Sequence, residues 1–242
     1  MKIEADLHVH TVASGHAYST VEEITKEAAK KGLKMVAITD HGPGLPGGAH
    51  LYHFWNLRIM PQELNSVRIL KGVEANIVSS DGELDLTDEY LEPLELVHAG
   101  FHPSCGYESG SAALNTKVLI KVMDNPLVDF IVHPGNWKFP IDPETLVDAA
   151  LEKGMALEIN NSSFLPTSSR NSARSFDLPI ANLAYKKRLQ VIISSDAHIY
   201  THVGVVDKAV ELAVSAGLDE EQIINTSVRK VLDYLTTRRA QR

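Results

Sequence analysis

The chain has 242 residues, of which 44% are hydrophobic and 22% are charged, and its formal net charge at pH 7 is −8. This length allows one sizeable domain with a full core, and the acidic balance disfavours a general nucleic-acid binder, which needs a basic surface to neutralise phosphates. Cys105 is the single cysteine beside 11 histidines. Intrachain disulfides and thiolate zinc clusters are therefore excluded, and any transition-metal site must be built from imidazole and carboxylate.

The sequence contains no apolar run long enough to span a bilayer. Residues 1–6 carry charged side chains and lead into a predicted strand, so we do not expect a signal peptide there. We therefore expect a cytoplasmic protein with no membrane contact. The negative charge does not exclude a small anionic substrate, because bound metal ions can reverse the local field.

Short apolar runs alternate with amphipathic segments along the chain. The first strand is predicted over residues 3–10. It is followed by Ser19-Thr20-Val21-Glu22-Glu23, a capping-type start for a helix that ends near Lys31. Further strands are predicted over residues 35–40, 68–75, 95–102, 130–133, 156–160 and 191–196. Helices are predicted over residues 112–123, 143–153, 172–187, 205–216 and 227–238.

The stretch from residue 42 to residue 62 fits neither element. It is rich in proline and glycine at first, and His50 and His53 follow among aromatic side chains. Loops of this length in compact domains are usually lids or binding loops. We therefore expect a functional loop here, with His50 and His53 as solvated residues or substrate contacts.

The alternation of near-continuous apolar strands with helices predicts a parallel sheet that is buried on both faces. About seven such units in one domain of residues 1–242 favour a barrel over an open, doubly wound sheet. The predicted fold class is thus α/β, with a single-domain barrel.

Residues that can bind metals stand where these strands end. In a parallel barrel the carboxyl ends of all strands meet at one face, where such folds place their active sites. Taken singly, each side chain would be explained as a packed or capping residue, but their common position at one end of the strands indicates a metal site. They are His8, His10, Asp40, His41, Glu74, His102, His133, Asp196 and His198.

The spacing of the histidines in the first predicted strand places them on the same face of the strand. Side chains at positions i and i+2 of a strand point to the same face, so His8 and His10 can bind one metal together, with Asp6 one step deeper. Asp196 and His198 repeat this spacing at the last strand. Imidazole and carboxylate ligands suit zinc, iron or manganese better than calcium or magnesium.

With these residues in place, the chain resembles the PHP (polymerase and histidinol phosphatase) family, and in particular its stand-alone YcdX-type phosphatases. The resemblance implies a distorted (β/α)₇ barrel with a trinuclear metal centre. It extends over residues 6–198 and is carried by Asp6-Leu7-His8-Val9-His10-Thr11, Thr39-Asp40-His41, Gly72-Val73-Glu74, His102, Val132-His133-Pro134 and Ser195-Asp196-Ala197-His198.

The resemblance also implies the ligands of each metal. His8, His10, Glu74 and Asp196 match the shell of the first metal. Glu74 matches the carboxylate that bridges to a second metal, which His102 and His133 would also hold. The ligands of the third metal match His16, His41 and His198. We expect three Zn²⁺ per chain, with iron or manganese possible at some or all positions.

The expected reaction is hydrolysis of a small phosphorylated substrate. Glu74 and Asp196 would ligate the metals, and a hydroxide that bridges the metals would attack phosphorus in line. Asp6 and Asp40 would orient neighbouring imidazoles or serve as structural hydrogen-bond acceptors. The sequence does not identify the acid that protonates the leaving group.

Other residues are weaker candidates for the site. Arg170, Arg174 and Lys138 follow strands that end at the predicted active face, so each could bind phosphate or belong to a solvated segment. His98 is expected inside the barrel and His202 at the surface, and Cys105 is expected to be a small side chain in a loop.

Several other functions are compatible with the same residues. Within the family, these are a histidinol phosphatase and an exonuclease, of which the acidic balance disfavours the exonuclease. Outside phosphoester chemistry, they are a metal-dependent amide hydrolase and a metal-binding regulatory domain without turnover. The sequence leaves the oligomeric state open, including a homo-oligomer.

Overall fold

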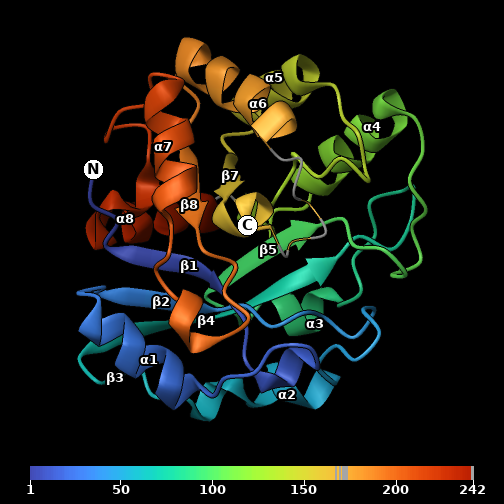
Figure 1. Cartoon of the computed structure of the whole chain (residues 1–242). Helices are drawn as coiled ribbons and strands as arrows, with labels where there is room; N and C mark the ends of the chain where they lie inside the picture. The colour runs from blue at the N-terminus through green and yellow to red at the C-terminus, as the bar shows by residue number, and fades with distance from the viewer. Residues whose placement is uncertain (167, 169, 171–173, 241–242) are drawn as a thin grey trace.

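A parallel barrel forms the centre of the protein (Figure 1). The structure is a computed structural model that describes residues 1–166, 168, 170 and 174–240. The barrel strands are β1 (Ala5–Val9), β2 (Met35–Ile38), β4 (Val67–Asn76), β5 (Leu96–Gly100), β6 (Phe130–Ile131), β7 (Ala156–Asn160) and β8 (Val191–Ser194).

These strands pair in the order in which they follow one another, and every pair is parallel. The ring is completed between β1 and β8, where Val9 and Ala197 form a parallel bridge and the His10 amide donates to the Ala197 carbonyl at 2.9 Å. A short strand, β3 (Glu63–Leu64), pairs antiparallel with β4 on the outside. The expected α/β barrel of seven parallel strands is thereby confirmed, with only a narrow closure at the β1–β8 seam.

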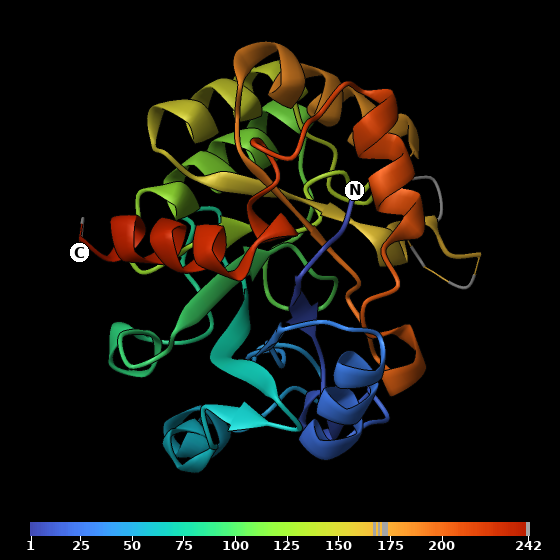
Figure 2. The ribbon, with the colours of Figure 1, turned by 90° about the vertical axis from the view of Figure 1, so that its left-hand side faces the viewer.

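Helices surround the barrel (Figures 1 and 2). Thr20 caps α1 through reciprocal bonds with Glu23, inside the predicted capping segment, and Asp142 caps α5 ahead of Pro143. No helix in the described part of the chain is long and apolar enough to cross a membrane. The helices are α1 (Val21–Lys30), α2 (Leu51–Asn56), α3 (Asp88–Leu91), α4 (Ala112–Met123), α5 (Pro143–Glu152), α6 (Arg174–Lys187), α7 (Asp207–Ser215) and α8 (Val228–Arg239).

The amino-terminal end of the barrel is closed by α8 and a packed interior. Leu7, Met35 and Phe130 fill the interior from three strands and contact Tyr234 and neighbouring residues of α8. The Tyr234 hydroxyl accepts from the Ala156 amide at 2.8 Å and donates to the Asp129 carbonyl at 2.9 Å, so the helix is tied to the strand starts. Polar side chains can therefore gather only at the opposite, carboxyl end.

The structure differs from the sequence prediction in the stretch from residue 42 to residue 62. We expected no regular element there, but α2 and a 3₁₀ turn (Leu57–Ile59) occupy its second half. The helix has only six residues, capped by the His50 side chain, which is too short to show a helical period in the sequence. The predicted start of α6, residues 172 and 173, lies outside the described residues.

Candidate metal centre

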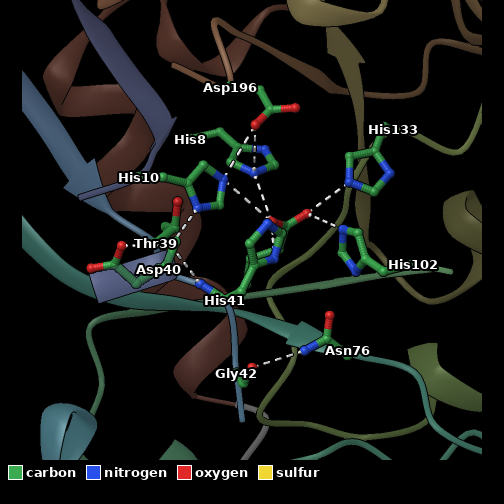
Figure 3. Close-up of polar contacts among 12 residues, drawn as sticks. His8, His10, Thr39, Asp40, His41, Gly42, Asn76, His102, His133 and Asp196 are labelled. Carbon is green, nitrogen blue, oxygen red and sulfur yellow. Dashed lines mark hydrogen bonds and ion pairs between the residues drawn. The ribbon is translucent and has the colours of Figure 1, made fainter. Parts of the chain in front are cut away.

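The carboxyl end of the barrel brings all nine predicted ligand side chains into one cluster, and Figure 3 shows several of them pointing to a common centre. Glu74, at the end of β4, lies in the middle. Its Oε1 is 2.7 Å from His133 Nε2 and 3.0 Å from His102 Nε2. Its Oε2 is 2.9 Å from His41 Nδ1, and the Nε2 atoms of His8 and His10 lie at 3.2 and 3.3 Å. One buried carboxylate thus faces five imidazoles.

A second carboxylate, Asp196, lies on the β8 side of the cluster. Its Oδ1 is 3.2 Å from His10 Nε2 and 3.7 Å from His8 Nε2. His198 follows two residues later, and its Nε2 is 2.9 Å from His16 Nε2. His16 is the most exposed member of the set, so this side of the cluster opens to solvent.

Neighbouring groups fix which imidazole nitrogen faces the centre. His8 Nδ1 donates to a carboxylate oxygen of Glu158 at 2.8 Å, and His10 Nδ1 lies 3.1 Å from the Ser14 hydroxyl. His16 and His198 donate through Nδ1 to backbone carbonyls, at 3.0 and 3.1 Å. Because a carbonyl or carboxylate oxygen only accepts, these bonds leave the Nε2 lone pairs free for a cation.

The unpartnered atoms in this cluster fit a set of bound cations. Among the described residues, the buried atoms without a hydrogen-bond partner include His8 Nε2, His10 Nε2, His41 Nδ1, His102 Nε2 and Glu74 Oε2. Buried polar atoms are normally paired, and neutral imidazole with carboxylate is the donor set of zinc and similar metals. In the part of the chain that the structure describes, three groups have ligand atoms close enough to share an ion: His8-His10-Glu74, His41-Glu74-His102 and His10-His41-His198.

Burial and neighbouring charge set the protonation of the cluster. Burial raises the pKa of Glu74, but the surrounding histidines, His41 and His102 foremost, outweigh it and hold this pKa well below its usual range. Burial, together with the positive charges that His198 and His41 can carry, lowers the pKa of His10 well below its usual range. An ionised carboxylate and a neutral imidazole are the forms that bind a metal.

The backbone is strained at two of these residues. His133 and Asp196 adopt left-handed conformations, with φ of 34° and 52°, which side chains with a Cβ rarely occupy. At His133 the turn aims the ring past Gly100, where an added Cβ would lie 2.8 Å from His133 Cε1. Strain at two strand ends that both face the cluster indicates that the fold is organised around this site.

Comparison with known proteins agrees with this geometry. The PHP domain, as a family model, matches residues 6–132. A protein named "probable phosphatase" from Caldanaerobacter subterraneus subsp. tengcongensis is 46% identical over 239 residues, which is 99% of this chain and 93% of that protein. The chain belongs to the PHP family. A "probable phosphatase" from Syntrophotalea carbinolica is also 46% identical, with 97% of each chain covered. The expected enzyme class, phosphoric ester hydrolase, is thereby confirmed.

Solved structures show the same PHP fold at low sequence identity. The histidinol phosphate phosphatase of Lactococcus lactis, crystallised with zinc, L-histidinol and phosphate, superposes with a TM-score of 0.65 at 17% identity. The match covers 90% of this chain and 95% of that one. At this identity the likeness is evidence for the barrel and not for a substrate.

Glu158, on β7, contacts this histidine cluster, and the sequence did not single it out. Its side chain is buried. It accepts a hydrogen bond from His8 Nδ1 and another from the His133 amide, each at 2.8 Å. Burial raises its pKa, but His8 and His133 outweigh this and lower it to about 2. A charged residue inside an apolar strand was the available signal, since a fully buried glutamate needs a partner.

We predict that Glu158→Gln lowers kcat/KM for phosphoester hydrolysis by about 10–100-fold, because an amide orients the two histidines less firmly. Steady-state kinetics on the zinc-loaded variant measures the effect, and Glu152→Gln, an exposed change on α5, is the control. Equal kinetics for the two variants would show that Glu158 has no positioning role.

Asp40 supports the same PHP site through Ser14. The Ser14 hydroxyl donates a hydrogen bond to Asp40 at 2.6 Å. It accepts hydrogen bonds from His10 Nδ1 and from the His41 amide, each at 3.1 Å. His53 of α2 lies 3.2 Å from Asp40 Oδ2, so the interpretation of His53 as a solvated residue is wrong. Burial raises the pKa of Asp40, but hydrogen bonds from His53 and Ser14 prevail and lower it to about 2.

Asp6 has a structural role in the barrel wall. Its carboxylate accepts from the Ser195 amide and hydroxyl and from the Gly204 amide, at 3.1, 2.5 and 2.7 Å. These bonds tie β1 to the segment that carries Asp196. Of the two roles expected for Asp6, the hydrogen bonds support the structural acceptor.

A cavity of about 370 Å³ opens over the cluster, and Arg170 lines it beside Asp196. The Arg170 guanidinium binds Asp196 Oδ2 and, through Nε, the Ser163 hydroxyl at 3.2 Å. Lys138 does not line this cavity, and its ammonium lies 5.9 Å from the Trp137 ring centroid. The Arg174 side chain lies outside the described part of the structure. Arg170 is therefore the candidate best placed for phosphate.

The remaining histidines and the cysteine lie away from the cavity or deep in the barrel. His98 is fully buried against His8 and Phe130, and burial lowers its pKa to about 3. His202 and His50 are exposed. Cys105 is a buried loop residue, and burial raises its pKa to about 12, which makes it an unreactive thiol at neutral pH.

Asp177 of α6 is a buried acid behind the site. It packs so closely on Gly135 that an added Cβ there would lie 1.8 Å from Asp177 Oδ1. Burial and then the charge of Glu158 raise its pKa to about 8, although Arg170 acts in the opposite direction. The native state therefore keeps this proton at pH values where the unfolded chain has released it.

We predict that Asp177→Asn makes the protein more stable at pH 8 by about 1–3 kcal/mol, with little change near pH 4. The contribution of a raised pKa is fully present below the unfolded value of 3.8 and is lost as the pH rises towards 8. An amide has no proton to lose. Thermal unfolding of both proteins at several pH values tests this, and a gain that does not depend on pH would contradict it.

Proposed function

We propose that this PHP protein is a metal-dependent phosphatase for small phosphorylated molecules, with the whole chain, residues 1–242, acting as one phosphoesterase domain. The observation that carries the proposal is Glu74, a buried carboxylate within 2.7–3.3 Å of nitrogens from five histidines. The cluster opens into a cavity large enough for a small substrate.

Three Zn²⁺ ions are the proposed occupants, with iron or manganese as substitutes. His8, His10, Glu74 and Asp196 would hold one ion, Glu74 with His102 and His133 a second, and His16, His41 and His198 a third. When bound, such metals supply an activated hydroxide for in-line attack on phosphorus and neutralise charge on the phosphoryl oxygens.

The residues of the chain hold and orient the reacting groups. Glu74 and Asp196 bring two negative charges that would offset the repulsion between bound cations, and Glu158 fixes the His8 tautomer through a 2.8 Å bond. Arg170, at the cavity wall, would bind a non-bridging phosphate oxygen with the guanidinium nitrogens that Asp196 and Ser163 leave free.

The proposal is tested with the purified chain loaded with zinc, assayed on p-nitrophenyl phosphate and on a panel of phosphomonoesters that includes histidinol phosphate. We expect turnover that disappears with a chelator and returns with added metal. Elemental analysis should give close to three metal ions per chain. Bound metal without turnover on any ester would instead support a regulatory domain, and a metal content near zero would contradict the site itself.

A further inference from the structure

A second cavity of about 370 Å³ lies beneath α2, on a different part of the surface from the metal centre. Its walls come from α2 and the turn after it, from β4, and from α3 and the segment after it; α2 and α3 lie near one another in Figure 1. The walls include Phe54, Trp55, Arg58, Lys71, Tyr90 and Glu95. Nothing in the proposed reaction uses this cavity.

The aromatic walls suit a planar ring. Trp55 is 43% exposed, although indoles usually lie buried, and its ring stands 6.4 Å from that of Tyr90 at an angle of 72°. Phe54 forms the buried side of the cavity. A planar ring that enters the cavity would contact the faces or edges of these side chains at its wall.

The charges of the cavity suit an anion, in contrast to the negative charge of the whole chain. The Arg58 guanidinium lies 5.1 Å from the centroid of the Trp55 ring. Lys71, on β4, lines the same cavity. Among the described residues, neither Arg58 nor Lys71 forms an ion pair with a carboxylate. Among the described residues that line the cavity, Glu95 is the one carboxylate, and it accepts from the Lys71 amide at 3.0 Å.

Helix α2 contributes to the walls of the second cavity and also contacts a residue that supports the metal centre. Phe54 and Trp55 of α2 face the second cavity, whereas His53, on the same turn, lies 3.2 Å from Asp40 Oδ2. Asp40 in turn holds the Ser14 hydroxyl, which contacts His10 and His41. A ligand that moves or immobilises α2 therefore acts on the bonds that orient two residues of the metal centre.

We propose that this cavity, the α2 pocket, binds a small planar aromatic anion, and that α2 transmits its occupancy to the Asp40–Ser14 network. The probe is 1-anilinonaphthalene-8-sulfonate, whose binding to the full-length, metal-loaded protein is followed by energy transfer from tryptophan. We expect saturable binding of one probe per chain. N-phenyl-1-naphthylamine, which lacks the sulfonate, should bind at least about tenfold more weakly.

Two double variants locate the site. Arg58→Gln with Lys71→Gln should weaken probe binding at least about tenfold, since it removes both cations of the pocket. Lys117→Gln with Lys186→Gln makes the same change of charge at exposed positions outside the pocket and should leave binding unchanged. Equal binding by the two double variants, or by the neutral naphthylamine and the sulfonate, would overturn the site.

Amide hydrogen exchange tests the transmission without any need for catalytic activity. With the probe bound, we expect slower exchange in residues 51–62 and also in residues 11–16 and 39–42, and no such change in the Arg58 and Lys71 double variant. Protection confined to residues 51–62 and 90–95 would support binding in the α2 pocket but would contradict the proposed transmission to the metal centre.

Discussion

We expect Glu74→Gln to lower kcat/KM for p-nitrophenyl phosphate by at least ~10³-fold while the fold is retained. Glutamine has nearly the same shape, but it is neutral, and its amide nitrogen is a donor with no lone pair available to ligate a cation. The five surrounding nitrogens would lose the negative charge that lies between them. Steady-state kinetics and elemental analysis on the same preparation separate lost metal from lost turnover.

Glu92→Gln, an exposed change of the same kind after α3, is the control and should behave as the unchanged protein. Circular dichroism before and after metal loading establishes that the variant is folded. Retention of more than a tenth of the activity, at full metal content, would contradict a central role for Glu74.

The strand-end residues could be predicted from the sequence because their positions depend on local rules. Strand alternation places His8 and His10 on one face, and parallel topology then gathers the ends of all strands. Glu74 and Asp196 follow from the same rules, since each ends an apolar run. Neither deduction needs the shape of a loop or the path of a helix.

The supporting residues could not be predicted in this way, because their contacts depend on how distant segments dock. Glu158 lies inside a strand, and its partner His8 is 150 positions away. His53 reaches Asp40 only because the chain turns back after residue 42 and brings α2 close to the residues that follow β2, which a six-residue helix does not reveal in its pattern. The contact between Arg170 and Asp196 likewise joins two segments whose approach is set by the closed barrel.

We expect Arg170→Met to lower kcat/KM for phosphomonoesters by about 10²–10³-fold and to weaken inhibition by inorganic phosphate. The methionine keeps an unbranched apolar chain in place of the arginine stem but removes the guanidinium that lines the cavity. Arg170→Lys should recover only part of the loss, because an ammonium cannot bind Asp196, Ser163 and a phosphate oxygen together in the planar geometry of a guanidinium. Initial rates with and without added phosphate give both quantities.

Metal content distinguishes phosphate binding from a purely structural role, because Arg170 also contacts Asp196. If Arg170 binds the substrate, the variants keep their metals while the inhibition constant for phosphate rises in the order arginine, lysine, methionine. Arg229→Met, an exposed change on α8, should alter neither quantity. Loss of metal with unchanged phosphate inhibition would show that Arg170 serves only to position Asp196, and the phosphate contact would then have to come from the metals alone.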